Sequence, residues 1–314
     1  MRETAAAAVG GTTTVAEMPL NASPVTTTVA ALKLKLEAAK GKLHVNVGFY
    51  GGVIPSNIDD LDELLNGGVF GIKAFLTHSG IDEFPNVTEA DLRRALPILK
   101  KHDILFIADE VITGFGRTGH WFATGGMKLE PDIVTLAKGI TSAHFPVSAS
   151  VISEKIWNVL RDASPEMGPV MHGFTYSGHP VGGALGLTNL AIMERENLIE
   201  NAAEVGPYLQ NALTQATADC PYVGEVRGMG QMIAIEYVAD RKSKRFFNPK
   251  ANAHRLVAAK ALAHGVMTRA LPFLETTSFS PPLTMNKSEA DEAVERYTKG
   301  LKAALPDLEK AAAM

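Results

Sequence analysis

The chain has little of what would place it in an oxidising compartment or in a membrane. Its 314 residues include a single cysteine, Cys220, which excludes an intrachain disulfide framework. No run approaches about 18 continuous apolar residues, so no transmembrane helix is predicted. Residues 1–30 lack the compact apolar core of a signal peptide, although their composition leaves a transit peptide open. We therefore expect a cytoplasmic protein.

The chain also has no large excess of charge of one sign. Its 30 Lys and Arg residues oppose 34 Asp and Glu residues, which gives a net charge of −4. Without a basic excess, neither a nucleic acid nor an anionic membrane is an expected partner. The hydrophobic content of 46% is ample for a core, and the length allows about two domains.

Two apolar runs, each followed by one charged residue, organise the sequence. Residues 104–108 form a continuous β-rich run that predicts a buried strand, and Asp109 follows it. Residues 133–137 form a second run of this kind, and Lys138 follows it. Because ligands bind outside the carboxyl ends of parallel strands, we expect Asp109 and Lys138 to face one crevice.

An amine and a carboxylate placed in this way suit pyridoxal 5′-phosphate (PLP). A lysine forms a Schiff base with the aldehyde of this cofactor, and an aspartate keeps the pyridinium nitrogen protonated. An isolated pair would more often be a turn cap at Asp109 and a solvated side chain at Lys138. The sequence around the two residues is needed to separate these interpretations.

Four segments carry that information, and they occur in a fixed order. They read Asp-Glu-Val-Ile-Thr-Gly-Phe-Gly-Arg-Thr-Gly (109–119), Thr-Leu-Ala-Lys-Gly (135–139), His-Gly-Phe-Thr-Tyr-Ser-Gly-His-Pro (172–180) and Ser-Pro-Pro-Leu (280–283). Together they resemble the class III (omega-type) PLP-dependent aminotransferases over roughly residues 104–305. The resemblance implies an α/β fold of type I, with part of the large-domain sheet in residues 104–205 and a small α+β domain in residues 206–314.

The resemblance also implies roles for individual residues. Lys138 would bind the cofactor and move the proton, and Asp109 would pair with the ring nitrogen. Val111 is expected on the ring face, although a plain core valine fits the same sequence. Thr175 matches a threonine that binds the cofactor phosphate across a dimer interface, with a structural threonine as the alternative. Arg269 matches an arginine that receives the substrate carboxylate, with a surface arginine as the alternative.

The implied reaction needs a small-molecule amine donor and a keto-acid acceptor. The donor would be an amine or an omega-amino acid, and the acceptor an α-keto acid such as pyruvate. The family is dimeric, so the resemblance implies a homodimer with sites at the interface. Arg117, in the Gly-Phe-Gly-Arg-Thr-Gly loop, would fix that loop or the dimer contact and is not expected to be catalytic.

The residues that follow the PLP-type segments predict a helix-rich C-terminal part. His179-Pro180 precedes a helical pattern to about Glu196, since Pro suits a first turn. Further helices are predicted at 197–217, at 250–264 and at 289–305, the last capped by Ser288. Strands are predicted at 222–227, 231–237, 266–269 and 276–279.

Residues 1–103 alternate strand and helix patterns in a different way. Strand-like segments at 11–18, 43–50 and 69–76 alternate with helical segments at 26–40, 57–66 and 88–101. Thr88 is the expected N-cap of the last helix. This alternation predicts parallel βα units, as in part of a barrel.

The sequence of this region resembles allantoinase, a cyclic amidohydrolase, over residues 4–103. The matching segments are Gly-Gly-Thr-Thr-Thr-Val (10–15), His-Val-Asn-Val-Gly-Phe-Tyr-Gly-Gly (44–52), Gly-Val-Phe-Gly-Ile-Lys-Ala-Phe-Leu (68–76) and Ser-Gly-Ile-Asp-Glu-Phe-Pro (79–85). The resemblance implies units of a TIM barrel whose two metal ions share a carboxylated lysine, which Lys73 matches. The other ligands of that family fall outside this segment, so Lys73 is a lone match and no metal site is expected.

Because the polypeptide resembles two different families, three functional hypotheses are open. The first is a PLP-dependent transaminase. The second is a catalytically inactive fusion of two incomplete enzymes, because residues 1–103 contain neither the phosphate-binding loop nor the stacked aromatic residue that the transaminase resemblance implies. The third and least expected is a metal-dependent amidohydrolase. The join near residues 100–104 fits a gene fusion, a misassembled gene or an engineered chimera.

Overall fold

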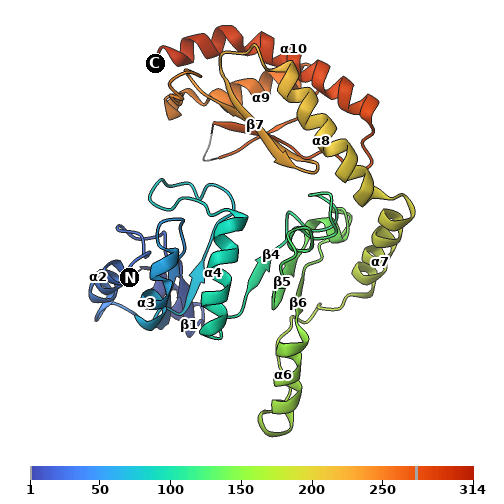
Figure 1. Cartoon of the computed structure of the whole chain (residues 1–314). Helices are drawn as coiled ribbons and strands as arrows, with labels where there is room; N and C mark the ends of the chain where they lie inside the picture. Colours follow the sequence, from blue (N-terminus) through green and yellow to red (C-terminus); the bar gives the residue numbers. More distant parts are fainter. Residues whose placement is uncertain (1, 273–274) are drawn as a thin grey trace. The chain divides into compact units, whose positions relative to one another are not determined.

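The computed structural model describes residues 2–272 and 275–314 of the chain. The chain divides into two compact units, Met1–Phe106 and Ile107–Met314 (Figure 1). Each unit has its own sheets and helices. In the described residues, no helix is both long and apolar enough to cross a membrane.

The first unit alternates strands and helices, as the sequence predicts. Its three strands are parallel and lie in the order β1-β2-β3. The strands are β1 (Thr14–Glu17), β2 (Asn46–Gly52) and β3 (Gly71–Lys73). The helices are α1 (Arg2–Val9), α2 (Val29–Ala39), the short 3-10 turn η1 (Ile58–Asp60), α3 (Leu61–Asn66) and α4 (Glu89–Lys101). Helix α1 was not predicted from the sequence.

Capping side chains set where the helices of this unit begin. Thr88 is the N-cap of α4, and its hydroxyl accepts a hydrogen bond from the backbone N–H of Asp91. The Asp91 carboxylate in turn accepts from the backbone N–H of Thr88, which completes a capping box. The predicted cap and helix are therefore confirmed. Thr28 caps α2 in the same way, through the N–H of Ala31.

The second unit begins with a mixed three-stranded sheet. The strands are β4 (Ile107–Asp109), β5 (Ile133–Leu136) and β6 (Ala149–Ile152), in that order. Strand β4 pairs with β5 in parallel, and β6 pairs with β5 antiparallel. The short helix α5 (Ala123–Gly126) lies between β4 and β5 in sequence. The predicted strand at 133–137 is confirmed.

The prediction of a buried strand at 104–108 is wrong in its bounds and its burial. Strand β4 is shorter and begins three residues later, at Ile107. The side chain of Ile107 is 53% exposed, and Leu105 is also exposed. The physical reason is that β4 is an edge strand of a three-stranded sheet, so its side chains lack the covering layers that a central parallel strand has.

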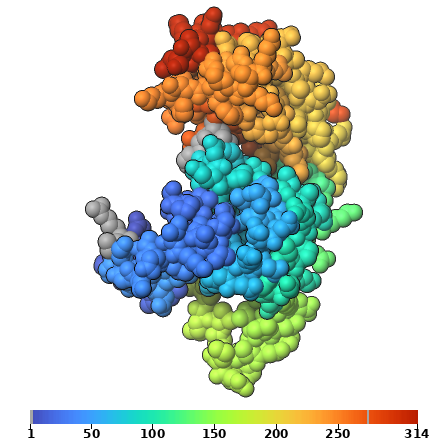
Figure 2. Space-filling model, turned by 60° about the vertical axis from the view of Figure 1, so that its left-hand side comes forward, coloured from blue at the N-terminus to red at the C-terminus, as the bar shows by residue number. Residues whose placement is uncertain are grey.

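Helix α6 (Glu154–Met167) has no buried residue. It projects away from the sheet β4-β5-β6, and the yellow-green residues around it form a protrusion in the space-filling view (Figures 1 and 2). Helix α7 (Pro180–Arg195) follows, as predicted, with Pro180 in its first turn. Residues 168–179 between the two helices are exposed throughout.

The C-terminal part of the second unit is an α+β domain, as predicted. Its antiparallel sheet has the order β7-β8-β10-β9. The strands are β7 (Val223–Met229), β8 (Met232–Tyr237), β9 (Arg269–Ala270) and β10 (Thr276–Phe279). The helices are α8 (Leu198–Ala216), α9 (Ala253–Ala263) and α10 (Lys287–Ala312), with the 3-10 turn η3 (Pro249–Ala251) before α9.

This domain has a continuous hydrophobic core. Leu209, Leu213, Ile235 and Tyr297 are fully buried in it, from α8, β8 and α10. The Tyr237 hydroxyl lies 2.5 Å from that of Tyr297 and 2.6 Å from that of Thr277, so the buried polar groups are hydrogen-bonded to one another. Burial raises the pKa of Tyr237 well above its usual range.

The predicted start and end of the last helix are wrong. Asn286, and not Ser288, is the N-cap of α10, and it forms a capping box with Glu289. The helix also continues past Pro306 to Ala312 instead of ending near 305. Leu308 and Ala311 are buried in the core, so packing of the apolar stripe outweighs the cost of an internal proline.

Candidate active site

The candidate site lies at the carboxyl ends of β4 and β5. The two strands pair in parallel, with Asp109 opposite Thr135. Asp109 is the last residue of β4, and Lys138 begins the 3-10 turn η2 (Lys138–Ile140) just after β5. Strands β4 and β5 lie side by side (Figure 1), so the predicted carboxylate and amine stand on neighbouring strand ends.

Two hydrogen bonds orient the Asp109 carboxylate. Its Oδ1 atom accepts from the backbone N–H of Val111 at 3.1 Å, which is a turn closed by the aspartate side chain, and from the Thr135 hydroxyl at 3.4 Å. Both contacts involve the same oxygen, and in the described residues Oδ2 takes part in no hydrogen bond. The carboxylate is thus fixed on one side and available to a donor on the other.

Lys138 is held in an unusual backbone conformation. Its φ is +44°, in the left-handed region that costs a non-glycine residue roughly 1 kcal/mol. The neighbouring Gly139 packs so closely on Phe115 that an added Cβ would lie 2.8 Å from the Phe115 Cβ. The side chain of Lys138 is exposed and forms no ion pair in the described part of the chain. The Lys138 side chain is therefore accessible to a ligand just after the end of β5.

Asn189 on α7 supports the Lys138 turn and was not predicted as a site residue. Its Nδ2 atom donates to the carbonyl oxygens of Gly139, at 2.9 Å, and Ile140, at 3.3 Å. The Gly139 carbonyl also accepts from the backbone N–H of Ser142 at 3.4 Å, so the Asn189 amide adds to the hydrogen bonds that fix this turn. The only sequence signal is an amide within the apolar pattern of a helix.

Glu110 is a second residue whose part in the site was not predicted. It is 1% exposed, and its carboxylate accepts from the backbone N–H groups of Ala123 at 3.1 Å and Thr124 at 2.7 Å, and from the Thr113 hydroxyl. A buried carboxylate satisfied by three donors holds the loop after Asp109 against the start of α5. Its adjacency to Asp109 made it easy to overlook.

Three other predicted site residues have clear positions. Val111 is half-buried in the turn that follows Asp109. Thr175 is exposed in the turn closed by the backbone N–H of Ser177 and the carbonyl of Phe174. Arg269 is exposed on β9, paired with Ser278 of β10. No hydrogen bond among the described residues joins Thr175 or Arg269 to the Asp109–Lys138 pair, so their roles stay predictions.

The predicted lone metal-site match has a structural explanation of its own. The Lys73 ammonium lies 4.9 Å from the centre of the Phe75 ring, a favourable cation–π distance. Among residues 2–272 and 275–314, no group of three or more His, Cys, Asp or Glu residues could hold a metal ion.

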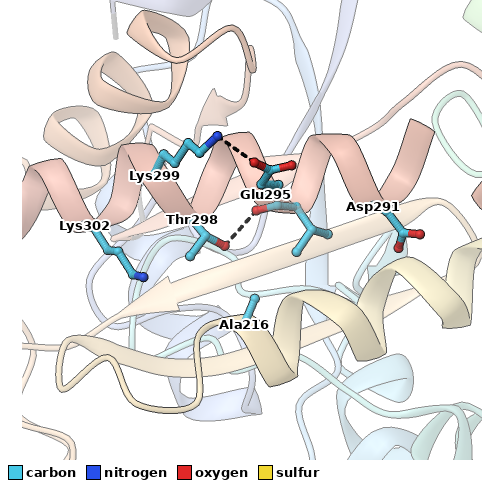
Figure 3. A pocket seen from close by; sticks show the side chains of 7 residues that line it. Ala216, Asp291, Glu295, Thr298, Lys299 and Lys302 are labelled. Atoms are coloured by element: carbon cyan, nitrogen blue, oxygen red, sulfur yellow. Dashed lines mark hydrogen bonds and ion pairs between the residues drawn. The ribbon is translucent and has the colours of Figure 1, made fainter. Parts of the chain in front are cut away.

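A surface groove of about 340 Å³ lies between α8 and α10. Thr298 of α10 points toward Ala216 of α8 across it, and Lys299 pairs with Glu295 at 2.6 Å on the other side of α10 (Figure 3). Exposed pairs of this kind contribute little energy. None of the predicted site residues lines this groove.

The residues at the strand ends fit PLP. The exposed Lys138 amine and the Asp109 carboxylate, with one oxygen not engaged in a hydrogen bond, are the two groups that the cofactor aldehyde and ring nitrogen require. A backbone turn on each strand end fixes the point from which each side chain extends. The donor set is thus chemically suited to this cofactor.

Comparison with known proteins identifies the same chemistry. The family model "Aminotransferase class-III" matches residues 85–301. An uncharacterized aminotransferase of Sinorhizobium fredii is 43% identical over 256 residues, which cover 81% of this chain and 54% of the relative. The diaminobutyrate–2-oxoglutarate transaminase of Halomonas elongata is 46% identical over 204 residues, covering 65% of this chain and 44% of the relative.

Solved structures give a consistent result. A thermostable omega transaminase variant from Pseudomonas jessenii has a TM-score of 0.67 at 33% identity, and the match covers 90% of this chain and 56% of that chain. A transaminase from ancestral reconstruction has a TM-score of 0.68 at 34% identity, with 88% and 55% covered. The chain spans about half the length of the curated relatives that it matches.

The similarity also extends into the first unit. Residues 104–314 are about two-thirds of the chain, so a structural match over 88% of it includes residues before 104. The family model likewise begins at residue 85. Both findings assign transaminase similarity to part of the segment for which the sequence predicts amidohydrolase units. The sequence match to the Sinorhizobium relative covers 81% of the chain, so it too includes residues before 104.

Proposed function

Because the chain belongs to the class-III aminotransferase family, we propose that it catalyses PLP-dependent transamination. The observation that carries the proposal is the pair Asp109 and Lys138, on neighbouring parallel strand ends, with a carboxylate oxygen and an amine that no ion pair of the described residues engages. The family depends on PLP, and the residues present fit this cofactor.

The chain's own residues would divide the work between them. When bound, PLP supplies an electron sink next to the carbon that carries the amino group. Asp109 would hold a proton on the ring nitrogen through its free carboxylate oxygen, with Val111 beside the ring. Lys138 would bind the cofactor and, when displaced, would accept and return the proton on the reacting carbon. Thr175 would donate its hydroxyl to the cofactor phosphate.

We propose an amine donor with a second polar group and an α-keto acid acceptor. The names of relatives support this class, since they include a diaminobutyrate–2-oxoglutarate transaminase and a putrescine–pyruvate aminotransferase. The exposed guanidinium of Arg269 would receive a carboxylate through a bidentate fork. Pyruvate remains the proposed acceptor, with 2-oxoglutarate as the alternative that the same names support.

We also propose that two copies of the chain associate as a homodimer. Large apolar side chains are exposed along 151–187, and they include Trp157, Met171 and Phe174. Exposed apolar surface of this extent marks an association surface or an aggregation hazard. Thr175 lies within it, which supports a phosphate contact made from one copy to the other.

The alternative proposal, a catalytically inactive fusion, also has a specific observation in its favour. The strands of the first unit follow one another as neighbours in the sheet, in the order β1-β2-β3. Consecutive parallel neighbours fit a singly wound barrel, and three strands in this order also occur within one half of a doubly wound sheet. We retain an amidohydrolase origin for residues 4–103 as a proposal that this order permits.

The experiment that tests the function is titration of the purified chain with PLP. Visible absorbance of the bound cofactor should appear in the wild type and should be lost in Lys138→Ala. Lys128→Ala, another exposed lysine at positive φ, serves as a matched control and should keep the absorbance. If the wild type acquires no absorbance beyond that of free PLP while circular dichroism shows it folded, the inactive fusion is the correct reading. Donor assays with putrescine and 4-aminobutyrate would follow a positive result.

A further inference from the structure

The loop after Asp109 contains an arginine that the proposed reaction does not use. Arg117 is half-buried, and its Nη1 atom donates to the carbonyl oxygens of Gln231, at 3.2 Å, and Pro281, at 2.6 Å. The backbone N–H of Gln231 donates back to the carbonyl of Arg117 at 3.0 Å. The loop is thus joined to two separate segments of the C-terminal domain.

The partial burial of the Arg117 guanidinium has a cost in lost hydration, which its hydrogen bonds must offset. Burial lowers the pKa of the Arg117 guanidinium, which nevertheless stays charged. No carboxylate among the described residues pairs with it. A partly desolvated cation held only by carbonyl dipoles is less stable than one with a counter-ion, so the two hydrogen bonds must compensate for lost hydration.

Glycines bring the backbones of this loop, of the β7–β8 turn and of helix α8 together. Gly230, in the turn between β7 and β8, has φ +54°, and an added Cβ would lie 2.4 Å from the carbonyl carbon of Thr118. A Cβ at Gly206 on α8 would lie 2.2 Å from the backbone of Gly230. A Cβ at Gly119 would lie 3.0 Å from the Cα of Ala203. Loop, turn and helix are in direct backbone contact around Arg117.

The Pro281 carbonyl, which accepts a hydrogen bond from Arg117, lies close in sequence to the strand that pairs with Arg269. Pro281 lies two residues after β10 ends, and Ser278 of β10 pairs with Arg269 of β9. At the other end, the loop that carries Arg117 begins at Asp109 and Glu110. The Arg117 guanidinium therefore connects the loop that begins at Asp109 to the sheet that contains Arg269.

We propose that Arg117 is a positioning residue that locks the loop after Asp109 to the β7–β8 turn and to the segment after β10, so that Asp109 and Arg269 keep a fixed separation. The part that concerns substrate rests on the proposed function. Asn201 on α8 acts beside it, because its Nδ2 atom donates to the carbonyl oxygens of Leu283, at 2.6 Å, and Met285, at 3.0 Å.

The first test needs no activity and uses hydrogen exchange on the full chain. Arg117→Met should raise amide exchange about tenfold in 115–121, 228–233 and 280–286, because two charge-assisted hydrogen bonds are lost. Exchange in the core of α10 should not change. Arg195→Met is the matched control, since among the described residues this exposed arginine pairs only with the adjacent Glu196. Unchanged exchange in the three segments, or an equal rise in α10, would overturn the proposal.

Two further variants keep the test decisive if Arg117→Met does not fold. Arg117→Lys keeps the charge but reaches one carbonyl, so it should give an intermediate rise in the same segments. Gly230→Ala leaves the arginine intact and separates the backbones sterically, so it should open the same segments. A rise confined to other regions in both variants would contradict the proposal.

A kinetic test then separates positioning of substrate from general structure. In the active, PLP-loaded chain, Arg117→Met should raise KM about tenfold for a donor with a carboxylate and leave KM for a diamine unchanged, with kcat reduced less than twofold. Arg117→Lys should partly restore KM. An equal rise in KM for both donors would mean that Arg117 stabilises the structure but does not position the substrate. A chain that binds no PLP would refute the proposed function, while the exchange result would still decide whether the clamp exists.

Discussion

The two parts of the second unit differ in how completely they bury their apolar residues. The C-terminal domain packs α8, α9 and α10 on one antiparallel sheet, and its largest core side chains are fully buried. Residues 107–197 bury only a small cluster around Phe115 and Leu136, and leave large apolar residues such as Leu187 exposed. The difference shows that the C-terminal domain has a continuous core, whereas residues 107–197 leave much of their apolar surface exposed.

Matched leucines should show the largest contrast between the two parts. Leu213 on α8 is fully buried, and Leu187 on α7 is 72% exposed. Replacing each by alanine therefore compares a buried site with an exposed one. Leu213→Ala should lower the free energy of unfolding by about 3 kcal/mol. Leu187→Ala should lower it by less than about 0.5 kcal/mol. Urea unfolding followed by circular dichroism measures both.

A large loss of unfolding free energy in Leu187→Ala would contradict this contrast, and its concentration dependence would show the reason. If the loss at Leu187 grows with protein concentration, a second copy of the chain covers this residue, as the proposed homodimer requires. If the loss is large and independent of concentration, residues 107–197 are more completely packed than the exposed surface indicates. The two outcomes are separated by repeating the unfolding curve over a hundredfold range of concentration.

The second prediction concerns the site within the less complete part. Glu110→Gln should destabilise the loop after Asp109 by about 2 kcal/mol, because an amide accepts fewer hydrogen bonds than the carboxylate that now satisfies two backbone N–H groups and a hydroxyl. PLP absorbance should weaken accordingly. Glu130→Gln, at an exposed position between the two strands, is the control and should leave both unchanged.

The smallest expected effect is a pH dependence in the C-terminal domain. A hydrogen bond and ion pair with Lys287 lower the pKa of the Glu204 carboxyl below its ordinary value of 4.5, and the same contact raises the pKa of Lys287. The stability that comes from Glu204 is present above its ordinary pKa and is lost as pH falls through the lowered value. Glu204→Gln should therefore flatten the acid limb of the stability curve slightly. A steeper acid limb in the variant would contradict this assignment.

Much of the local structure was predictable because single residues decide it. Thr88 with Asp91 fixes the start of α4, and His179-Pro180 fixes the start of α7. The apolar run before Lys138 places this amine at a strand end. The start of α10 was mispredicted because Asn286 and Ser288 are both good caps, and only the capping box with Glu289 favours Asn286.

The supporting residues of the candidate site were not predictable in this way. Asn189 contacts the Lys138 turn from a helix fifty residues later, and Glu110 finds its donors in α5. Such contacts depend on how elements pack, which no local pattern records. The exposure of Ile107 has the same origin, because its burial depends on which strands lie beside β4.

The sequence by itself determined the strand ends, the helix caps and the identities of the amine and the carboxylate, since each depends on a few adjacent residues. Tertiary structure alone decided which oxygen of Asp109 is engaged, that Lys138 lies at positive φ, and that Arg117 joins the loop to the C-terminal domain. The physical reason is that hydrogen bonds between distant segments and the burial of a charge arise only when those segments pack together.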